Sequence, residues 1–168
     1  MSTREHKSKA PKQLNLGIIS VSTTRTLEQD KSGLWIAKLA RREGHTVVSH
    51  VVVQDQTYAI TQALRGCMEE NAPHAVLVTG GTGIAEKDVT IEAVKPLLDK
   101  ELTAFAALFA QLSFEEIDSA ALMSRSVAGI VDKTAVFCMP GSLKACKLAC
   151  KALIFPELGH IAKHVYSG

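Results

Sequence analysis

The 168-residue chain is 46% hydrophobic and carries a formal net charge of +2 at pH 7. This length and apolar content are typical of one domain that can bury a core of its own. Its apolar runs stop at strand length, well short of the roughly 20 residues that a membrane-spanning helix needs. No apolar segment and cleavage site follow the first residues as in a secretory signal. We therefore expect a cytoplasmic protein with no membrane segment.

Residues 1–13 form a basic segment, which contains four lysine and arginine residues and a single glutamate. Such a polar composition predicts a flexible tail, and residues 14–168 then form one domain. Because the tail supplies more than the whole net charge, the domain is close to neutral. It has few aromatic residues and no basic stripe, so we expect no nucleic-acid partner.

The four cysteines are predicted to be buried free thiols. They contain no C-x-x-C pair with a nearby histidine, the arrangement typical of a zinc site. Free cysteine is among the most buried residue types in a reducing compartment. The cysteines are Cys67, Cys138, Cys146 and Cys150.

The first half of the domain alternates between strands and helices. Short apolar runs rich in β-branched residues are typical of strands covered on both faces, and apolar residues at helical spacing indicate the helices between them. A parallel sheet follows, because parallel neighbours need a crossover that a helix supplies. The expected strands are 16–21, 46–53 and 75–79, and the expected helices are 34–43, with Gly44 as its cap, and 58–70.

The second half continues the pattern. Thr90 is expected to cap a short helix that Pro96 ends or kinks. The sequence Ser113-Phe114-Glu115-Glu116 matches a capping box and predicts that another helix starts there. Residues 134–139 read as a late strand, followed by a tight turn in which Ser142 caps a further helix.

Four polar segments follow strands of the predicted parallel sheet, and ligands bind at that edge of such sheets. The glycines at 80, 81 and 83 allow backbone N–H groups to approach an anion, and Gly81 or Gly83 is expected in a conformation costly for other residues. The loop is neither a P-loop nor a complete dinucleotide fingerprint. The four segments are 22–25, 54–56, 79–88 and 140–142.

Two carboxylates support the interpretation that the ligand of this loop carries phosphates. Asp55 and Asp88 come from loops at the same end of the sheet and could together hold a magnesium ion that bridges phosphates. The alternative is that Asp88 caps a turn and Asp55 is a solvated loop residue. Spacing alone does not separate these two interpretations.

Several motifs in a fixed order resemble the MoaB/MogA family of molybdenum-cofactor biosynthesis proteins. The resemblance covers the chain from about Leu16 to its C-terminus and is stronger to the MoaB branch. The motifs are Val78-Thr79-Gly80-Gly81-Thr82-Gly83-Ile84 with Asp88-Val89-Thr90, Leu112-Ser113-Phe114-Glu115-Glu116-Ile117, Ser124-Arg125-Ser126-Val127-Ala128-Gly129 and Met139-Pro140-Gly141-Ser142-Leu143-Lys144-Ala145.

The resemblance implies a three-layer αβα sandwich with a mostly parallel central sheet that binds molybdopterin. Active family members use Mg²⁺ and ATP to adenylylate its terminal phosphate and release pyrophosphate. Asp55 and Asp88 would then be the catalytic and metal-binding residues, and Arg125 could face an anionic group. The other implied substrate-binding residues are Ser22, Thr79, Gly80, Gly81, Thr82, Gly83, Pro140, Gly141 and Ser142.

The sequence departs from the family pattern near both acids. Thr23 stands where aspartate is frequent, Gln54 and Gln56 replace a proline and a second acid, and Lys87 replaces arginine. A molybdopterin-binding carrier without turnover, or a scaffold protein, therefore stays an alternative to the adenylyltransferase.

The family resemblance also implies a trimer or hexamer. The apolar segment 105–109 exceeds what one exposed helix face usually shows, which favours a subunit interface. A fully buried core helix would explain the same segment.

Overall fold

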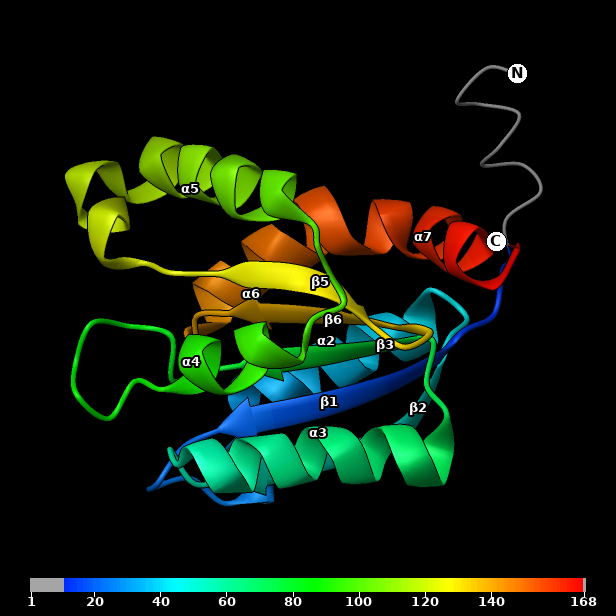
Figure 1. Ribbon diagram of the computed structural model, residues 1–168. Helices are drawn as coiled ribbons and strands as arrows, with labels where there is room; N and C mark the ends of the chain where they lie inside the picture. Colours follow the sequence, from blue (N-terminus) through cyan, green and yellow to red (C-terminus); the bar gives the residue numbers. More distant parts are fainter. Residues whose placement is uncertain (1–10, 168) are drawn as a thin grey trace.

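The computed structural model describes residues 11–167 and contains a six-stranded sheet in the order β2-β1-β3-β6-β5-β4 (Figure 1). The first four of these strands are parallel, whereas β5 runs antiparallel to both of its neighbours. The mixed, mostly parallel sheet confirms the predicted fold class. The strands are β1 (Asn15–Val21), β2 (Thr46–Val53), β3 (Ala75–Thr79), β4 (Lys100–Glu101), β5 (Val127–Val131) and β6 (Thr134–Met139).

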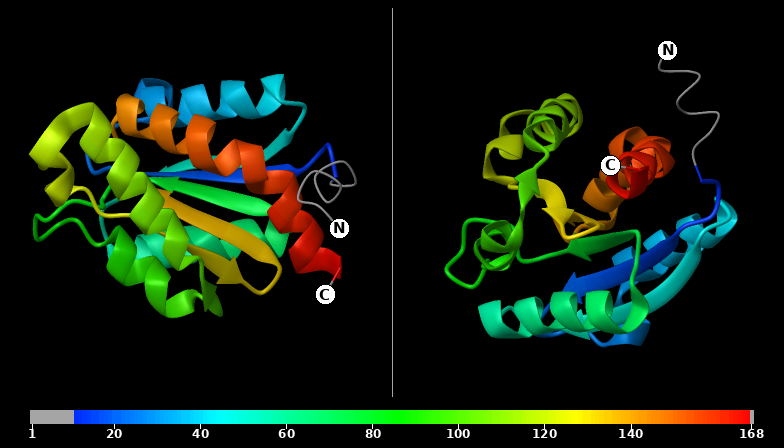
Figure 2. Two further views of the ribbon diagram at one scale, coloured as in Figure 1. Left: turned by 90° about the horizontal axis from the view of Figure 1, so that it is seen from above. Right: turned by 45° about the vertical axis from the view of Figure 1, so that its right-hand side comes forward.

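Helices cover both faces of the sheet and give three layers (Figure 2). One face carries α2 (Lys31–Arg42), α5 (Thr103–Ile117), α6 (Leu143–Ala149) and α7 (Phe155–Ser167), and the other carries α3 (Thr57–Asn71) and α4 (Thr90–Val94). Short turns of irregular helix join them. These are η1 (Leu27–Gln29), η2 (Lys95–Leu97), η3 (Asp118–Met123) and the π-helical η4 (Cys150–Ile154).

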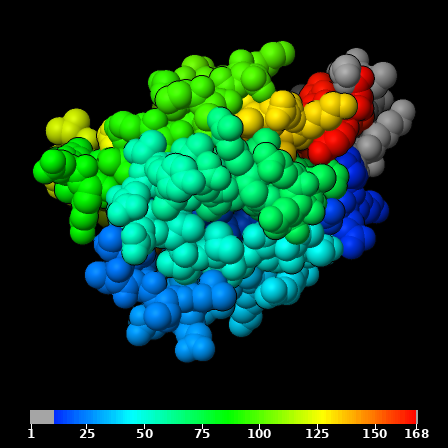
Figure 3. Space-filling view, turned by 60° about the horizontal axis from the view of Figure 1, so that its bottom comes forward, coloured from blue at the N-terminus to red at the C-terminus, as the bar shows by residue number. Residues whose placement is uncertain are grey.

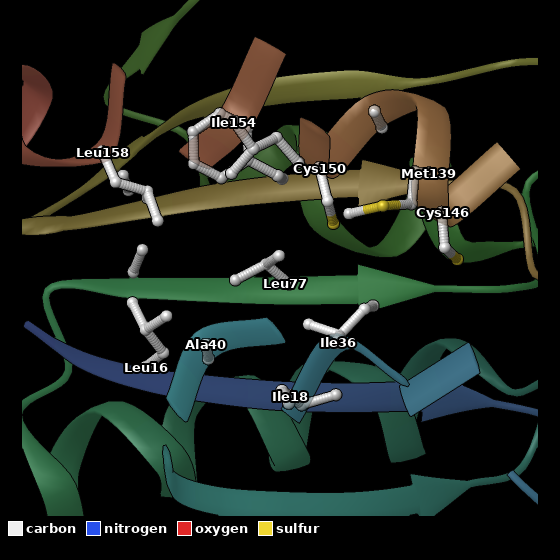
Figure 4. Close-up of a cluster of buried hydrophobic side chains, with 14 of the residues drawn as sticks. Leu16, Ile18, Ile36, Ala40, Leu77, Met139, Cys146, Cys150, Ile154 and Leu158 are labelled. Carbon is white, nitrogen blue, oxygen red and sulfur yellow. The ribbon is translucent and has the colours of Figure 1, made fainter. Parts of the chain in front are cut away.

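Alternate residues of the strands build two separate cores. Leu16 and Ile18 of β1 point to the face of α2 and α7, where they meet Ile36 and Leu158 (Figure 4). Ile19 points to the opposite face, toward α3 and α4. Because both faces of the parallel strands are buried, these strands read in the sequence as continuous apolar runs.

The predicted elements agree with the structure in the first half of the chain. Gly44 follows α2 with φ of 88°, as its predicted capping role requires. The short helix α4 ends at Val94, before Pro96, which confirms the predicted break. The four cysteines are buried free thiols, as predicted.

One predicted helix start and one predicted helix cap are wrong. Ser113 does not begin a helix but lies inside α5, which starts at Thr103, and it is buried together with Phe109 one turn earlier and Phe105 two turns earlier. Packing of this inward face against the sheet outweighs the local capping signal. Thr90 is not a cap either, because its hydroxyl donates to the carbonyl oxygen of Gly80 at 2.8 Å.

The predicted basic tail lies outside the described residues, apart from residues 11–13. Across the described residues, none of the helices combines the length and the apolar character that crossing a membrane requires.

Candidate functional site

A cavity of about 450 Å³ opens at the carboxyl ends of the parallel strands. Connections leave β1 and β3 toward opposite sides of the sheet, and such a switch point is where open α/β sheets bind ligands. The loops after β1 and β3 project on the same side of the molecule (Figure 3). The lining residues are Val21, Ser22, Thr23, Thr24, Arg25, Asp55, Gly80, Gly81, Thr82, Gly83, Lys87, Asp88, Met123, Ser124, Pro140, Gly141 and Ser142.

The glycines of the loop are required for different reasons. Gly80 and Gly81 have φ of 98° and 63°, a region that side chains disfavour. A β-carbon on Gly81 would also overlap the hydroxyl of Thr90. Gly83 has no such conformation, but its β-carbon would lie 2.6 Å from Oδ2 of Asp88. The predicted backbone constraint therefore holds at Gly81, whereas at Gly83 the constraint is space.

The carbonyl oxygens of the loop are held by the surrounding protein. Arg125 Nε donates to the carbonyls of Thr82 and Gly83 at 3.1 and 3.0 Å, and Thr90 binds the carbonyls of Gly80 and Gly81. In the described part of the chain, the N–H groups of Gly81, Thr82 and Gly83 make no hydrogen bond. Consecutive free N–H groups beside a cavity are suited to an anion.

Arg125 does not line the cavity, contrary to the expectation that it faces an anionic ligand. Its guanidinium forms a two-pronged ion pair with Glu92, with Nη1–Oε1 and Nη2–Oε2 distances of 2.5 and 3.2 Å. Its Nη2 also donates to the carbonyl of Asp88. Hydrogen bonding between the two side chains lowers the pKa of Glu92 and raises the pKa of Arg125. Arg125 therefore holds the loop in shape.

The two predicted acids both line the cavity. Oδ1 of Asp55 lies 3.4 Å from the position of a β-carbon on Gly81, and Asp88 lies beside Gly83. Oδ2 of Asp88 also accepts the N–H of Ala85 at 2.9 Å. Asp88 thus closes a turn and borders the cavity at once, so the two sequence interpretations do not exclude each other.

The carboxylates of these acids are the ligand type that a magnesium ion prefers. Within residues 11–167, no group of three or more His, Cys, Asp or Glu side chains could enclose a metal. Mg²⁺ does not need such a group, because it commonly binds through one or two carboxylates together with substrate phosphates and water. Asp55 and Asp88 offer that number of ligands.

The remaining predicted residues join the loops to one another. Thr79 is buried and donates to the carbonyl of Pro140 at 3.1 Å, which places it beneath the cavity. A β-carbon on Gly141 would lie 3.0 Å from Cα of Gly80, so these two turns touch. Ser142 caps α6 by accepting the N–H of Ala145, as predicted. Ser22 accepts the N–H groups of Thr24 and Arg25 and folds the loop after β1.

Two cations of the site were not among the predicted residues. Arg25 and Lys87 both line the cavity, from the loops after β1 and β3. Both could have been identified from the sequence, because each is a cation in a loop that borders the predicted anion site. Together they supply positive charge next to the free N–H groups of the glycine loop.

A buried polar network also supports the site. Asp30 caps α2 through the N–H of Gly33, and its Oδ2 contacts the hydroxyl of Ser20 at 2.5 Å and Nε2 of His50 at 2.8 Å. Burial alone would raise the pKa of Asp30, but its hydrogen bonds with these groups outweigh burial and lower it. In the same first turn of α2, Ser32 donates to the carbonyl of Gly141. The start of α2 is thereby fixed to the cavity.

Known proteins with similar sequences and structures identify the family of this chain. The family model described as a probable molybdopterin binding domain matches residues 17–160. Molybdenum cofactor biosynthesis protein B of Bacillus subtilis (strain 168) is 47% identical over 167 residues, which cover 98% of each chain.

Two crystal structures have the same fold along nearly the whole chain. One, of a molybdenum cofactor biosynthesis protein B, has a TM-score of 0.91 at 43% identity and covers 95% of this chain and 100% of that chain. The other, of the tungsten cofactor synthesizing protein MoaB from Pyrococcus furiosus, has a TM-score of 0.84 at 36% identity and covers 93% and 99%. This chain belongs to the molybdopterin-binding domain family of molybdenum-cofactor biosynthesis proteins.

Proposed function

We propose that this protein binds molybdopterin at the glycine loop and adenylylates its terminal phosphate with Mg²⁺ and ATP. The observation that carries the proposal is the row of free N–H groups at Gly81, Thr82 and Gly83, with their carbonyl oxygens held from outside the cavity. A phosphate in this loop would accept from those N–H groups. Arg25 and Lys87 would balance its charge.

The proposed reaction joins two phosphates. An oxygen of the molybdopterin phosphate attacks the α-phosphorus of ATP, the bond from that phosphorus to the bridging α–β oxygen breaks, and pyrophosphate leaves with the bonding electrons. Such transfers depend mainly on positioning and charge neutralisation. A bound magnesium ion would stabilise the negative charge of the leaving pyrophosphate, and Asp55 and Asp88 would hold that ion at the cavity.

Pyrophosphate release tests this proposal directly. The purified chain is incubated with molybdopterin, ATP and Mg²⁺, and pyrophosphate is measured in parallel reactions that lack molybdopterin. We expect release that requires all three components. Binding of molybdopterin without pyrophosphate release would leave the adenylyltransferase proposal refuted.

A carrier without turnover is the second candidate function. It is favoured by the neighbours of Asp55, since Gln54 and Gln56 offer no second carboxylate in that loop, and by Thr23 in the loop after β1. The carrier predicts molybdopterin affinity that does not depend on Mg²⁺ or ATP. The enzyme predicts pyrophosphate release that requires molybdopterin, ATP and Mg²⁺ together.

We also propose that the protein works in the cytoplasm as a homotrimer or a hexamer. Several large apolar side chains of α5 and η3 are exposed, and a contiguous apolar patch of this kind often marks a subunit interface. Segment 105–109 contributes only in part, because Phe105 and Phe109 are buried and Leu108 is exposed. The exposed side chains are Leu108, Phe114, Ile117, Leu122 and Met123.

A further inference from the structure

Helix α7 carries two histidines whose ring nitrogens meet. His160 and His164 are one helical turn apart, and their Nε2 atoms lie 3.0 Å from each other. Their ring centroids are 4.7 Å apart, with the planes at 61°. The Nε2 atoms of the two rings are therefore close enough to contact each other.

The carboxylate of Glu157 fixes the orientation of one ring. Its Oε2 lies 3.2 Å from Nδ1 of His160, one turn earlier in the same helix. A neutral imidazole that donates its Nδ1–H to this carboxylate carries its lone pair on Nε2. Metal-binding histidines commonly have such a carboxylate on the nitrogen that does not bind the metal.

The distance between the two Nε2 atoms suits a shared metal ion. With metal–nitrogen distances near 2.0 Å and tetrahedral angles, two ligating nitrogens stand about 3.3 Å apart. The observed 3.0 Å is also that of a hydrogen bond between the two rings. A metal ion would thus replace the proton between the rings with only a small change in the distance between the nitrogens, and the rings would turn so that both lone pairs meet at the ion.

The histidine pair opens onto a cavity away from the glycine loop. This cavity, of about 560 Å³, is also lined by Asp99, Lys100 and Asp132, and Asp132 lies in the turn before β6. The glycine loop lies at the other end of the parallel strands. Within residues 11–167 no group of three or more potential ligands is present, so His160 and His164 are the two ligands that this part of the chain would supply.

We propose that His160 and His164 chelate one borderline divalent transition ion, of the class of Ni²⁺, Cu²⁺ or Zn²⁺, with Glu157 orienting His160. Imidazole ligands suit these ions and not Mg²⁺, which prefers oxygen. This metal site is separate from the magnesium ion proposed at Asp55 and Asp88.

A calorimetric titration of the full chain with Ni²⁺ tests the site. We expect one saturable site in the wild type, and its loss in both His160→Gln and His164→Gln. Glu157→Gln keeps both ligands and should weaken binding about tenfold. Lys163→Gln, on the same helix, serves as the matched control and should bind as the wild type does.

Unfolding of each variant without metal is measured by circular dichroism, so that a folding defect is recognised. His164 is exposed, so His164→Gln decides the question if the half-buried His160 proves necessary for folding. A wild type without saturable Ni²⁺ binding would overturn the proposal. Equal Ni²⁺ affinity in the folded His164→Gln variant would overturn it as well.

Discussion

Arg125 and Glu92 form a two-pronged ion pair outside the cavity lining, 33 residues apart in the sequence. The same guanidinium holds three carbonyl oxygens of the segment from Thr82 to Asp88. Glu92 fixes the plane of Arg125, and Arg125 fixes the loop. The shape of the anion site therefore depends on a salt bridge that the ligand does not touch.

Replacement of Arg125 by lysine should distinguish the effect of its positive charge from its effect on the shape of the glycine loop. Lysine keeps the positive charge but cannot reach Glu92 and several carbonyls at once. We expect Arg125→Lys to weaken molybdopterin binding about tenfold, which corresponds to the loss of about 1.4 kcal/mol of hydrogen bonding to the loop. Calorimetry measures the affinity. Lys144→Gln, which removes an exposed cation paired with Glu116, is the control.

The glycine loop should tolerate no side chain at position 83. A valine there would place its β-carbon against Asp88, so Gly83→Val should abolish molybdopterin binding while the domain stays folded. Gly66 has open space around its β-carbon position and lies within α3. Gly66→Ala should keep full affinity and gain up to about 1 kcal/mol of stability. A folded Gly83→Val variant with wild-type affinity would contradict the assignment of the loop.

The network around Asp30 should make stability depend on acid pH. Because the folded-state pKa of Asp30 lies below its ordinary value of 3.8, its ionised form stabilises the fold above that value. This contribution is lost as the pH falls through the folded-state pKa. Asp30→Asn keeps an acceptor for the N–H of Gly33 but loses the charge beside His50, and should cost about 2 kcal/mol at pH 7.

Urea unfolding at pH 7 and at pH 3 measures this effect. The difference between the wild type and Asp30→Asn should shrink at the lower pH, since protonation removes the wild-type advantage. Asp118→Asn, at the start of η3, controls for a general loss of negative charge. A difference that stays constant between the two pH values would argue against an ionised Asp30 as the source.

The proposed oligomer should depend on the exposed apolar side chains near the end of α5. Leu122 is 90% exposed and Phe114 is 58% exposed. The double variant Phe114→Ser, Leu122→Asp should shift the protein to a monomer in light scattering at micromolar concentration. Tyr58 is 76% exposed on α3, on the other side of the sheet, so Tyr58→Ser should not change the mass. A monomeric wild type would contradict the proposed assembly.

The parallel part of the fold could be predicted because burial on both faces leaves a clear apolar signal. Strand β4 lacks this signal, whereas β5 is apolar but is paired antiparallel to its neighbours. The two residues of β4 are exposed, and β5 depends on a tight turn at Asp132, whose φ is 52°. The amide of Asp132 binds the carboxylate of Asp99, a contact between residues 33 positions apart. Such pairings are set by the folded chain and cannot be deduced from local sequence patterns.

Those residues of the site could be predicted whose role follows from their residue type alone. The glycines and the two acids follow strands, so their loops had to meet at one edge of the sheet. The role of Arg125 depends on Glu92, and the role of Asp30 depends on His50, which lies 20 residues away. Nothing in the spacing of these residues indicates their partners. The sequence therefore predicted which loops form the cavity but not what holds those loops in place.

Substitution of the two acids of the cavity distinguishes the adenylyltransferase hypothesis from the carrier hypothesis. If Asp55 and Asp88 hold magnesium, their charge is what the reaction needs, so Asp55→Asn and Asp88→Asn should keep the fold and much of the molybdopterin affinity. Turnover should fall by about a hundredfold or more, in kcat and kcat/KM together, because the lost interaction acts mainly in the transition state. In the Asp88→Asn variant, the amide oxygen of the new side chain can still accept the N–H of Ala85 and preserve the turn.

Pyrophosphate release and molybdopterin affinity are measured on the same preparations, with Asp99→Asn as a control acid remote from the cavity. A wild type that binds molybdopterin without releasing pyrophosphate would leave the carrier as the function. If the wild type is active and its Asp55→Asn and Asp88→Asn variants keep full turnover, the protein is an enzyme but the proposed metal site is wrong. Loss of affinity and turnover together in both variants would instead make the acids part of the binding surface for molybdopterin, because charge removal would then affect the ground state as strongly as the transition state.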